Sequence, residues 1–152
     1  MGGEAPWSAE AGRAKVAERG LPASEREGTL EGWLIYDTGL AKKGRHWVGE
    51  GHQYGGVLGQ AGNCQVAVTL SIANHHASLP VGYRLYLPKE WAEDRARRNK
   101  AGVPDEVVFK TKTAIALDLV QAASAADLAR GVALMDGAYG CDTELRTGIS
   151  AL

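Results

Sequence analysis

The chain has 152 residues and a mass of 16.1 kDa, which is enough for one domain with a buried core. Its formal net charge is -1, so no overall positive field marks it as a nucleic-acid-binding protein, and DNA binding would have to come from local clusters. Cys64 and Cys141 lie outside any CxxC pair, which excludes a disulfide framework or a zinc knuckle. No apolar stretch approaches the roughly 18 residues of a membrane span, and the N-terminus lacks the apolar core of a signal peptide. We therefore expect a cytoplasmic protein with no membrane partner.

The N-terminal part carries little pattern. Residues 1–28 are rich in Ala, Glu and Gly, with a modest helical periodicity over residues 8–19, so we expect a helical linker segment there and the folded domain over residues 29–152. A short strand at 33–36 should end at Asp37. A basic turn at 42–45 should precede a second strand at about 47–54.

The middle of the chain contains the clearest strand pattern. Apolar residues occupy every second position over residues 63–73, at Cys64, Val66, Val68, Leu70 and Ile72. A period of two predicts an antiparallel strand with one covered face. The alternation returns over residues 81–87, after which Pro88 should open a charged helix over residues 89–100. A helix is expected after Thr113, a strand at 132–135 that ends at Asp136, and a further helix within residues 141–149.

Two of these predicted strands, 33–36 and 132–135, are each followed by an aspartate. A strand that follows a crossover helix usually returns parallel to an earlier strand, so the two could lie side by side in a mixed sheet. Asp37 and Asp136 would then emerge at the same end of the sheet. Carboxylate oxygens suit Mg²⁺ or Mn²⁺, and a pair of such ions supports phosphodiester cleavage. The alternative is two unrelated turn residues, because Asp is common in turns.

A series of short motifs accompanies the two aspartates. In chain order they are Trp-Leu-Ile-Tyr-Asp-Thr-Gly at 33–39, Lys-Lys-Gly at 42–44, Gln-Tyr-Gly-Gly at 53–56, Asn-Cys-Gln-Val-Ala-Val at 63–68, Arg-Leu-Tyr-Leu-Pro at 84–88, Trp91 with Asp94, Arg95, Arg97 and Arg98, Ala-Gly-Val-Pro at 101–104, and Val-Ala-Leu-Met-Asp-Gly at 132–137. In this order the series resembles the DDE-type endonuclease domain of bacterial insertion-sequence transposases, over roughly residues 31–146.

This resemblance implies both a fold and a function. The implied fold is α/β and ribonuclease H-like, with a mixed central sheet flanked by helices. The implied function is that of a DNA transposase, which cleaves and transfers DNA strands with Mg²⁺ or Mn²⁺. Asp37 and Asp136 match the first two catalytic and metal-binding acids of the family. The partners would be the DNA of transposon ends and, in the intact enzyme, further copies of the same subunit.

Two features depart from the family pattern. In relatives the third acid is a Glu on a helix well beyond the second Asp. Glu144 follows Asp136 too closely to match it, and the sequence stops at Leu152. We therefore expect a domain that is incomplete at its C-terminus and badly impaired in cleavage. Tyr36 also stands where relatives often have a second Asp.

Basic residues supply the expected contacts to DNA phosphates. The candidates for DNA contact are Lys42, Lys43, Arg45, Gln53, Arg95 and Arg98, with Lys110 and Lys112 as further basic residues. Lys42 and Lys43 follow Asp37 without acidic neighbours. Arg95 and Arg98 share their predicted helix with several acids, so a solvated face of mixed charge is an equal alternative there.

Two other functions stay open from the sequence. The chain could be a non-catalytic remnant that binds DNA or an intact transposase subunit. Alternatively, Asp37-Thr38-Gly39 matches the tripeptide of pepsin-like and retroviral proteases, in which two aspartates share a proton. Those sites usually continue with Ala or Ser, whereas Leu40 and two lysines follow here, and the chain has no second Asp-Thr-Gly.

Overall fold

The structure, a computed structural model, describes residues 9–44, 46–55 and 60–152. Within these ranges the elements in chain order are α1 (Ala9–Glu27), β1 (Gly32–Ala41), β2 (Gly51–Gly55), β3 (Gln60–Ala73), β4 (Ser78–Leu85), α2 (Lys89–Glu93), α3 (Arg95–Ala101), α4 (Lys112–Ala125), β5 (Val132–Met135), α5 (Gly137–Gly140) and α6 (Thr143–Ser150). None of the helices in these ranges has the length and apolar character needed to cross a membrane.

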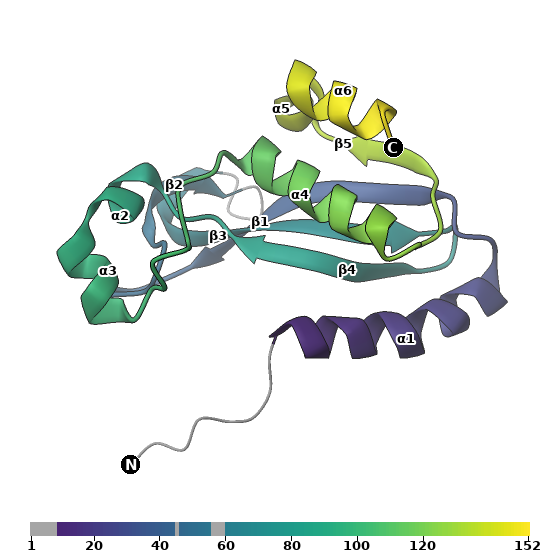
Figure 1. Cartoon of the computed structure of the whole chain (residues 1–152), viewed down its shortest axis with the longest axis horizontal. Helices are drawn as coiled ribbons and strands as arrows, with labels where there is room; N and C mark the ends of the chain where they lie inside the picture. Colours follow the sequence, from purple (N-terminus) through teal and green to yellow (C-terminus); the bar gives the residue numbers. More distant parts are fainter. Residues whose placement is uncertain (1–8, 45, 56–59) are drawn as a thin grey trace, which may run out of the picture.

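The five strands form one mixed sheet (Figure 1). Strand β3 pairs antiparallel with β1 along one side, and on its other side it pairs first with β2 and then with β4. Strand β5 pairs parallel with β1, and Ile35 lies opposite Met135. The crossover helix α4 leads into this parallel strand, as the sequence predicts. The expected α/β ribonuclease H-like fold, with a mixed sheet flanked by helices, is confirmed.

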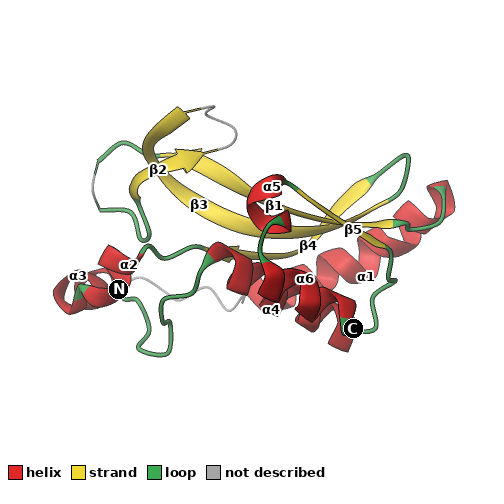
Figure 2. Cartoon of the chain, turned by 90° about the horizontal axis from the view of Figure 1, so that it is seen from above, coloured by secondary structure: helices red, strands yellow, loops and turns green. Residues whose placement is uncertain are grey.

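The core lies between the sheet and the helices α1, α4 and α6, which Figure 2 shows on one side of the sheet. Its side chains come from alternate positions of the central strands and from one face of α4: Trp33, Ile35, Val68, Leu70, Ile72, Ile115, Ala116, Val120 and Ala123. Burying each large aliphatic side chain contributes about 1.5–3 kcal/mol. The alternation predicted for β3 is confirmed, because its apolar residues at alternate positions are buried, and α4 covers the face that they form.

Strand β1 is longer than the sequence predicts. It continues through Asp37 to Ala41, because β3 pairs with it along its whole length, as far as Ala41 opposite Cys64. The expectation that this strand ends at Asp37 is wrong. Asp37 lies inside the strand, at an alternate position from Trp33 and Ile35, and so on the face that α4 covers.

The charged helix expected over residues 89–100 is two helices. Asp94 leaves the helical conformation with φ -83° and ψ 87°, and its side chain accepts a hydrogen bond from Arg97 N at 2.9 Å. The local N-cap interaction thus ends α2 and begins α3. Helix α4 likewise begins at Lys112, two residues earlier than predicted, because the Thr111 hydroxyl caps it by accepting a hydrogen bond from Ala114 N.

Helix α1 extends beyond the predicted residues 8–19 and contacts the sheet. A Cβ on Gly20 would lie 2.7 Å from Leu79 Cδ2, so helix and strand approach closely there. Asn74, in the turn after β3, donates to the carbonyl oxygens of Ser24 and Gly28, at 2.9 and 2.8 Å. The division of the chain at residue 28 stays a prediction, and α1 packs directly against the part that follows it.

Candidate active site

Asp37 is held in place by two donors from distant parts of the chain. Its Oδ2 atom accepts a hydrogen bond from Lys112 Nζ at 2.8 Å and another from the Tyr139 hydroxyl at 3.3 Å. The Asp37 side chain is only 19% exposed. The carboxylate therefore sits in a shallow, partly desolvated position between β1, α4 and α5.

Asp136 follows β5 directly and caps the short helix α5. Its Oδ1 atom accepts hydrogen bonds from Ala138 N at 2.9 Å and from Tyr139 N at 3.2 Å. The parallel register ends with Ile35 opposite Met135, so Asp37, inside β1, and Asp136, directly after β5, belong to neighbouring strands. Such strands lie about 4.8 Å apart. The crossover through α4 thus brings together two acids that lie far apart in the sequence.

Tyr139 links the two acids, because its backbone N–H donates to Asp136 and its hydroxyl donates to Asp37. The side chain is 2% exposed. Burial and the negative charges of Asp37 and Asp136 raise the pKa of the Tyr139 hydroxyl, so this group stays a neutral donor. Sequence reasoning missed Tyr139, since a lone tyrosine after a strand has no pattern that separates it from an ordinary core residue.

Lys112, at the first position of α4, supplies the positive charge beside Asp37. Its ammonium also lies 5.7 Å from the centre of the Tyr86 ring. From the sequence this lysine is one of several basic residues that could contact DNA. In the structure its charge faces the first acid.

The two acids offer oxygen atoms that fit a hydrated divalent ion. Among the described residues, no hydrogen bond is made to Asp37 Oδ1 or to Asp136 Oδ2. Mg²⁺ keeps several waters and is commonly held by one or two protein carboxylates, so this donor set suits it. No cluster of three or more His, Cys, Asp or Glu side chains suited to a metal occurs within the described ranges. The candidate metal ligands are therefore Asp37 and Asp136, with water as the remaining ligand.

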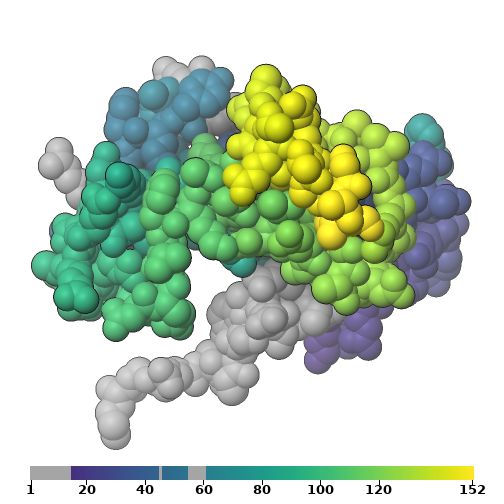
Figure 3. Space-filling model, turned by 45° about the horizontal axis from the view of Figure 1, so that its top comes forward, coloured from purple at the N-terminus to yellow at the C-terminus, as the bar shows by residue number. Residues whose placement is uncertain are grey.

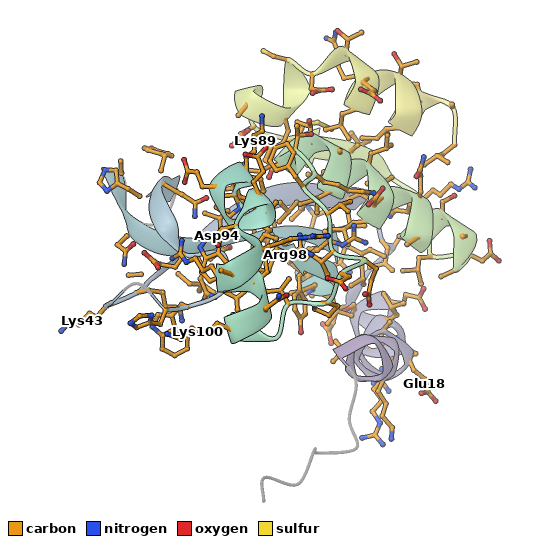
Figure 4. The ribbon with its side chains drawn as sticks, turned by 60° about the vertical axis from the view of Figure 1, so that its left-hand side comes forward. Glu18, Lys43, Lys89, Asp94, Arg98 and Lys100 are labelled. Carbon is orange, nitrogen blue, oxygen red and sulfur yellow. The ribbon has the colours of Figure 1, made fainter. Side chains whose placement is uncertain are left out.

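Several basic side chains gather at the end of the sheet beyond Asp37. Lys42 stacks on Trp47 at 4.5 Å from the ring centre, and Lys43 is exposed. His46 and Lys100 line one shallow hollow together with Trp91 and Arg97. Figure 4 shows Lys43 and Lys100 at the same end of the molecule, and Figure 3 shows the segment around residues 40–50 beside the one around residues 89–100. We call Lys42, Lys43, His46 and Lys100 the basic corner.

The other predicted DNA-contacting residues have varied surroundings. Arg98 is 8% exposed and donates to the carbonyl oxygens of Ala92 at 3.1 Å and Pro104 at 2.8 Å, so it fixes the loop after α3. The Gln53 amide donates to Gly49 O at 3.2 Å and Cys64 O at 3.0 Å, which holds the turn before β2. Arg95 is exposed on α3. Arg45 lies outside the described residues.

The two neighbouring histidines of the chain lie in a turn. His75 and His76 are exposed between β3 and β4, and His75 Nε2 lies 3.4 Å from Glu31. Among the described residues they join no metal-binding group.

Comparison with known protein families finds a match over almost the whole chain. The family model described as DDE superfamily endonuclease matches residues 3–152. No curated protein and no solved structure matches the chain. Enzymes of the DDE superfamily act on DNA and typically use divalent metal ions. The parallel strand β5, which lies beside β1 and ends directly before Asp136, agrees with this match, and the chain belongs to the DDE superfamily endonucleases.

Proposed function

We propose that this chain is the DNA-cleaving domain of an insertion-sequence transposase, in which Asp37 and Asp136 hold Mg²⁺ or Mn²⁺. The observation that carries the proposal is that Tyr139 hydrogen-bonds both acids, Asp37 on β1 and Asp136 directly after the neighbouring strand β5. The family match over residues 3–152 supports a transposase or nuclease function. The proposal includes transposon-end DNA as substrate, further copies of the subunit in the intact enzyme, and action in the cytoplasm.

A divalent ion at these acids would supply Lewis-acid stabilisation of charge on the phosphoryl oxygens. The residues of this chain orient the two carboxylates that would hold the ion. Asp37 lies opposite Val68 of β3, and its carboxylate is oriented by hydrogen bonds from Lys112 and Tyr139. Asp136 is oriented by two backbone N–H groups. Tyr139 keeps the two acids in register and excludes water from the side that faces the core.

The basic corner is placed to hold DNA that passes over the two acids. Lys42 follows Asp37 by five residues of extended chain, which span about 16 Å. Duplex DNA rises 3.4 Å per base pair, so this span covers about five base pairs. Lys42 and Lys43 can therefore contact phosphates within about half a helical turn of the acids, and Lys100 and Arg95 are the further candidates from α3. Arg98 and Gln53 would act by holding the loops that carry these residues.

One observation favours a second function, that of a DNA-binding domain without cleavage activity. No third acidic side chain joins Asp37 and Asp136 among the described residues. With two acids, one hydrated ion can be held, while a second lacks an anchor for the charge of the leaving oxygen. The aspartic protease alternative has no such support, because the recorded partners of Asp37 are a lysine and a tyrosine.

The test is a titration with Mn²⁺, in which free Mn²⁺ is counted by electron paramagnetic resonance. We expect Asp37→Asn and Asp136→Asn each to weaken Mn²⁺ binding by about tenfold or more, the effect of removing a charged ligand worth at least 1.4 kcal/mol. Asp142→Asn is the matched control, because Asp142 caps α6 much as Asp136 caps α5, and Asn is an equally good N-cap. Equal Mn²⁺ binding by the wild-type chain and Asp37→Asn would refute the proposal.

A further inference from the structure

Lys112 occupies a position that a helix does not favour for a cation. It is the first residue of α4, where the helix dipole is positive and acidic residues are preferred. Helix α4 has no acidic residue in its first turn to balance it. The charge is compensated across the fold, by Asp37, which is 75 residues away in the sequence. Lys112 thus follows no local preference of the helix, and its placement has a tertiary cause.

The ion pair between Lys112 and Asp37 is less exposed than a neighbouring ion pair that joins α4 to the residues before it. The Lys112 and Asp37 side chains are 31% and 19% exposed, whereas Lys110 and Asp118, which pair at 2.6 Å, are 42% and 27% exposed. Asp118 also pairs with Arg84 and shares its charge between two cations. Lys112 alone provides a cation to Asp37 among the described residues.

Lys112 and Tyr139 use the same carboxylate oxygen. Both donate to Asp37 Oδ2, and the Tyr86 ring lies beside the ammonium. A divalent ion shared with Asp136 would have to approach this carboxylate, and an ammonium at 2.8 Å both neutralises the acid and repels a second cation. The lysine therefore stands against metal binding, while it stabilises the metal-free fold.

We propose that Lys112 is the resident counter-ion of Asp37, and that its ammonium must leave Asp37 before a divalent metal ion binds there. This inference rests on the proposed metal-binding role of Asp37 and Asp136. Lys112 acts through Asp37 and is a positioning residue. It lowers the metal affinity of the site, and it compensates the charge of Asp37 when no metal is present.

The key variant is Lys112→Met, which keeps most of the length of the unbranched side chain and removes its charge. We expect Mn²⁺ to bind this variant about two- to fivefold more tightly than the wild-type chain, the range that follows from losing a partly exposed ion pair. Without metal its Tm should fall, because Asp37 is left half-buried with one donor fewer. Saturating Mn²⁺ should then raise the Tm of Lys112→Met by more than it raises that of the wild-type chain.

Three further variants separate charge from structure. Lys112→Gln should behave like Lys112→Met, and it serves in its place if Lys112→Met does not fold. Lys112→Arg keeps the positive charge and should bind Mn²⁺ no more tightly than the wild-type chain. Lys110→Met is the matched control. It removes the same charge two residues from Lys112, and Lys110 pairs with Asp118 and not with Asp37. Its Mn²⁺ affinity should equal that of the wild-type chain.

The outcomes distinguish this inference from the proposed function. A purely structural lysine would lower the Tm of Lys112→Met and leave the Mn²⁺ affinity unchanged or weaker, which would overturn the inference. If the wild-type chain binds Mn²⁺, Asp37→Asn does not, and Lys112→Met and Lys112→Gln show no gain, only the counter-ion role fails. If the wild-type chain and every neutral variant fail to bind Mn²⁺, both the metal site and the counter-ion role are refuted.

Discussion

The basic corner allows a quantitative prediction of how the DNA affinity of the protein depends on salt concentration. Lys43 and Lys100 are exposed and lie at the same end of the molecule, while Lys89 lies away from them (Figure 4). Each lysine that contacts a phosphate contributes about 0.9 to the slope of log K against log salt concentration. The double variant Lys43→Ala and Lys100→Ala should therefore show a slope shallower by about 1.8.

This change in slope has a measurable size. Between 50 and 200 mM salt, each lost contact removes about half a log unit of salt dependence, so two lost contacts remove about one log unit. The wild-type affinity should thus fall about tenfold further over this range than that of the double variant. Fluorescence anisotropy with a labelled duplex of about 20 base pairs, a length that exceeds the span from Asp37 to the basic corner, gives the slopes directly.

The control is Lys89→Ala. Lys89 pairs with Glu93 at 3.6 Å, and both side chains are 68% exposed. Lys89→Ala removes one positive charge, as each of the two substitutions in the double variant does, but it removes that charge away from the basic corner. An unchanged slope in the double variant, or an equal change per charge in Lys89→Ala, would refute the placement of DNA on this corner.

Three further predictions follow from the contacts around the site. Tyr139→Phe removes one long hydrogen bond to Asp37 and should lower the free energy of unfolding, measured by urea titration, by about 0.5–1 kcal/mol. Tyr54→Phe, at a side chain 63% exposed, should change it by nothing measurable. Equal losses in the two variants would contradict the link through Tyr139. Hydrogen bonds from Lys110 and Arg84 outweigh the effect of burial and lower the pKa of Asp118, so its stabilisation is present above the ordinary carboxyl pKa of about 3.9 and is lost as the pH falls through the lowered value. Asp118→Asn should therefore be less stable than the wild-type chain at pH 7 and equally stable at strongly acid pH, and a difference that persists in acid would exclude this cause. Finally, the purified 152-residue chain should not nick supercoiled plasmid in Mg²⁺, because the described residues bring only two acids together; nicking that Asp136→Asn abolishes would show that two acids are sufficient.

Parts of the fold follow from the sequence, because their patterns are local. The alternation over β3 needs only a period of two, and each apolar member of it is buried as predicted. The strand at 132–135 and the aspartate after it are also found where the sequence places them. The parallel return of β5 beside β1 follows from the handedness of crossover connections, which is a general property of the backbone.

Element boundaries depended on contacts that the hydrophobic periodicity does not show, some between distant segments and one within a single helical turn. Strand β1 continues past Asp37 because β3 supplies hydrogen-bonding partners as far as Ala41. The helix predicted at 89–100 divides because the Asp94 side chain competes for a backbone N–H. Arg98 is buried because the loop after α3 turns back and presents its carbonyl oxygens to the guanidinium.

The candidate site also has a part that the sequence predicts and a part that only the structure shows. Asp37 and Asp136 could be named from the sequence, because each stands beside a recognisable strand and within a recognisable motif. The partners of Asp37 could not be named, since Lys112 and Tyr139 lie 75 and 102 residues away from it. Their contacts exist only once α4 has crossed over the sheet and α5 has folded at the end of β5. A side-chain hydrogen bond depends on distance in space, which the sequence does not contain, so the tertiary structure alone decided which cation and which hydroxyl face the first acid.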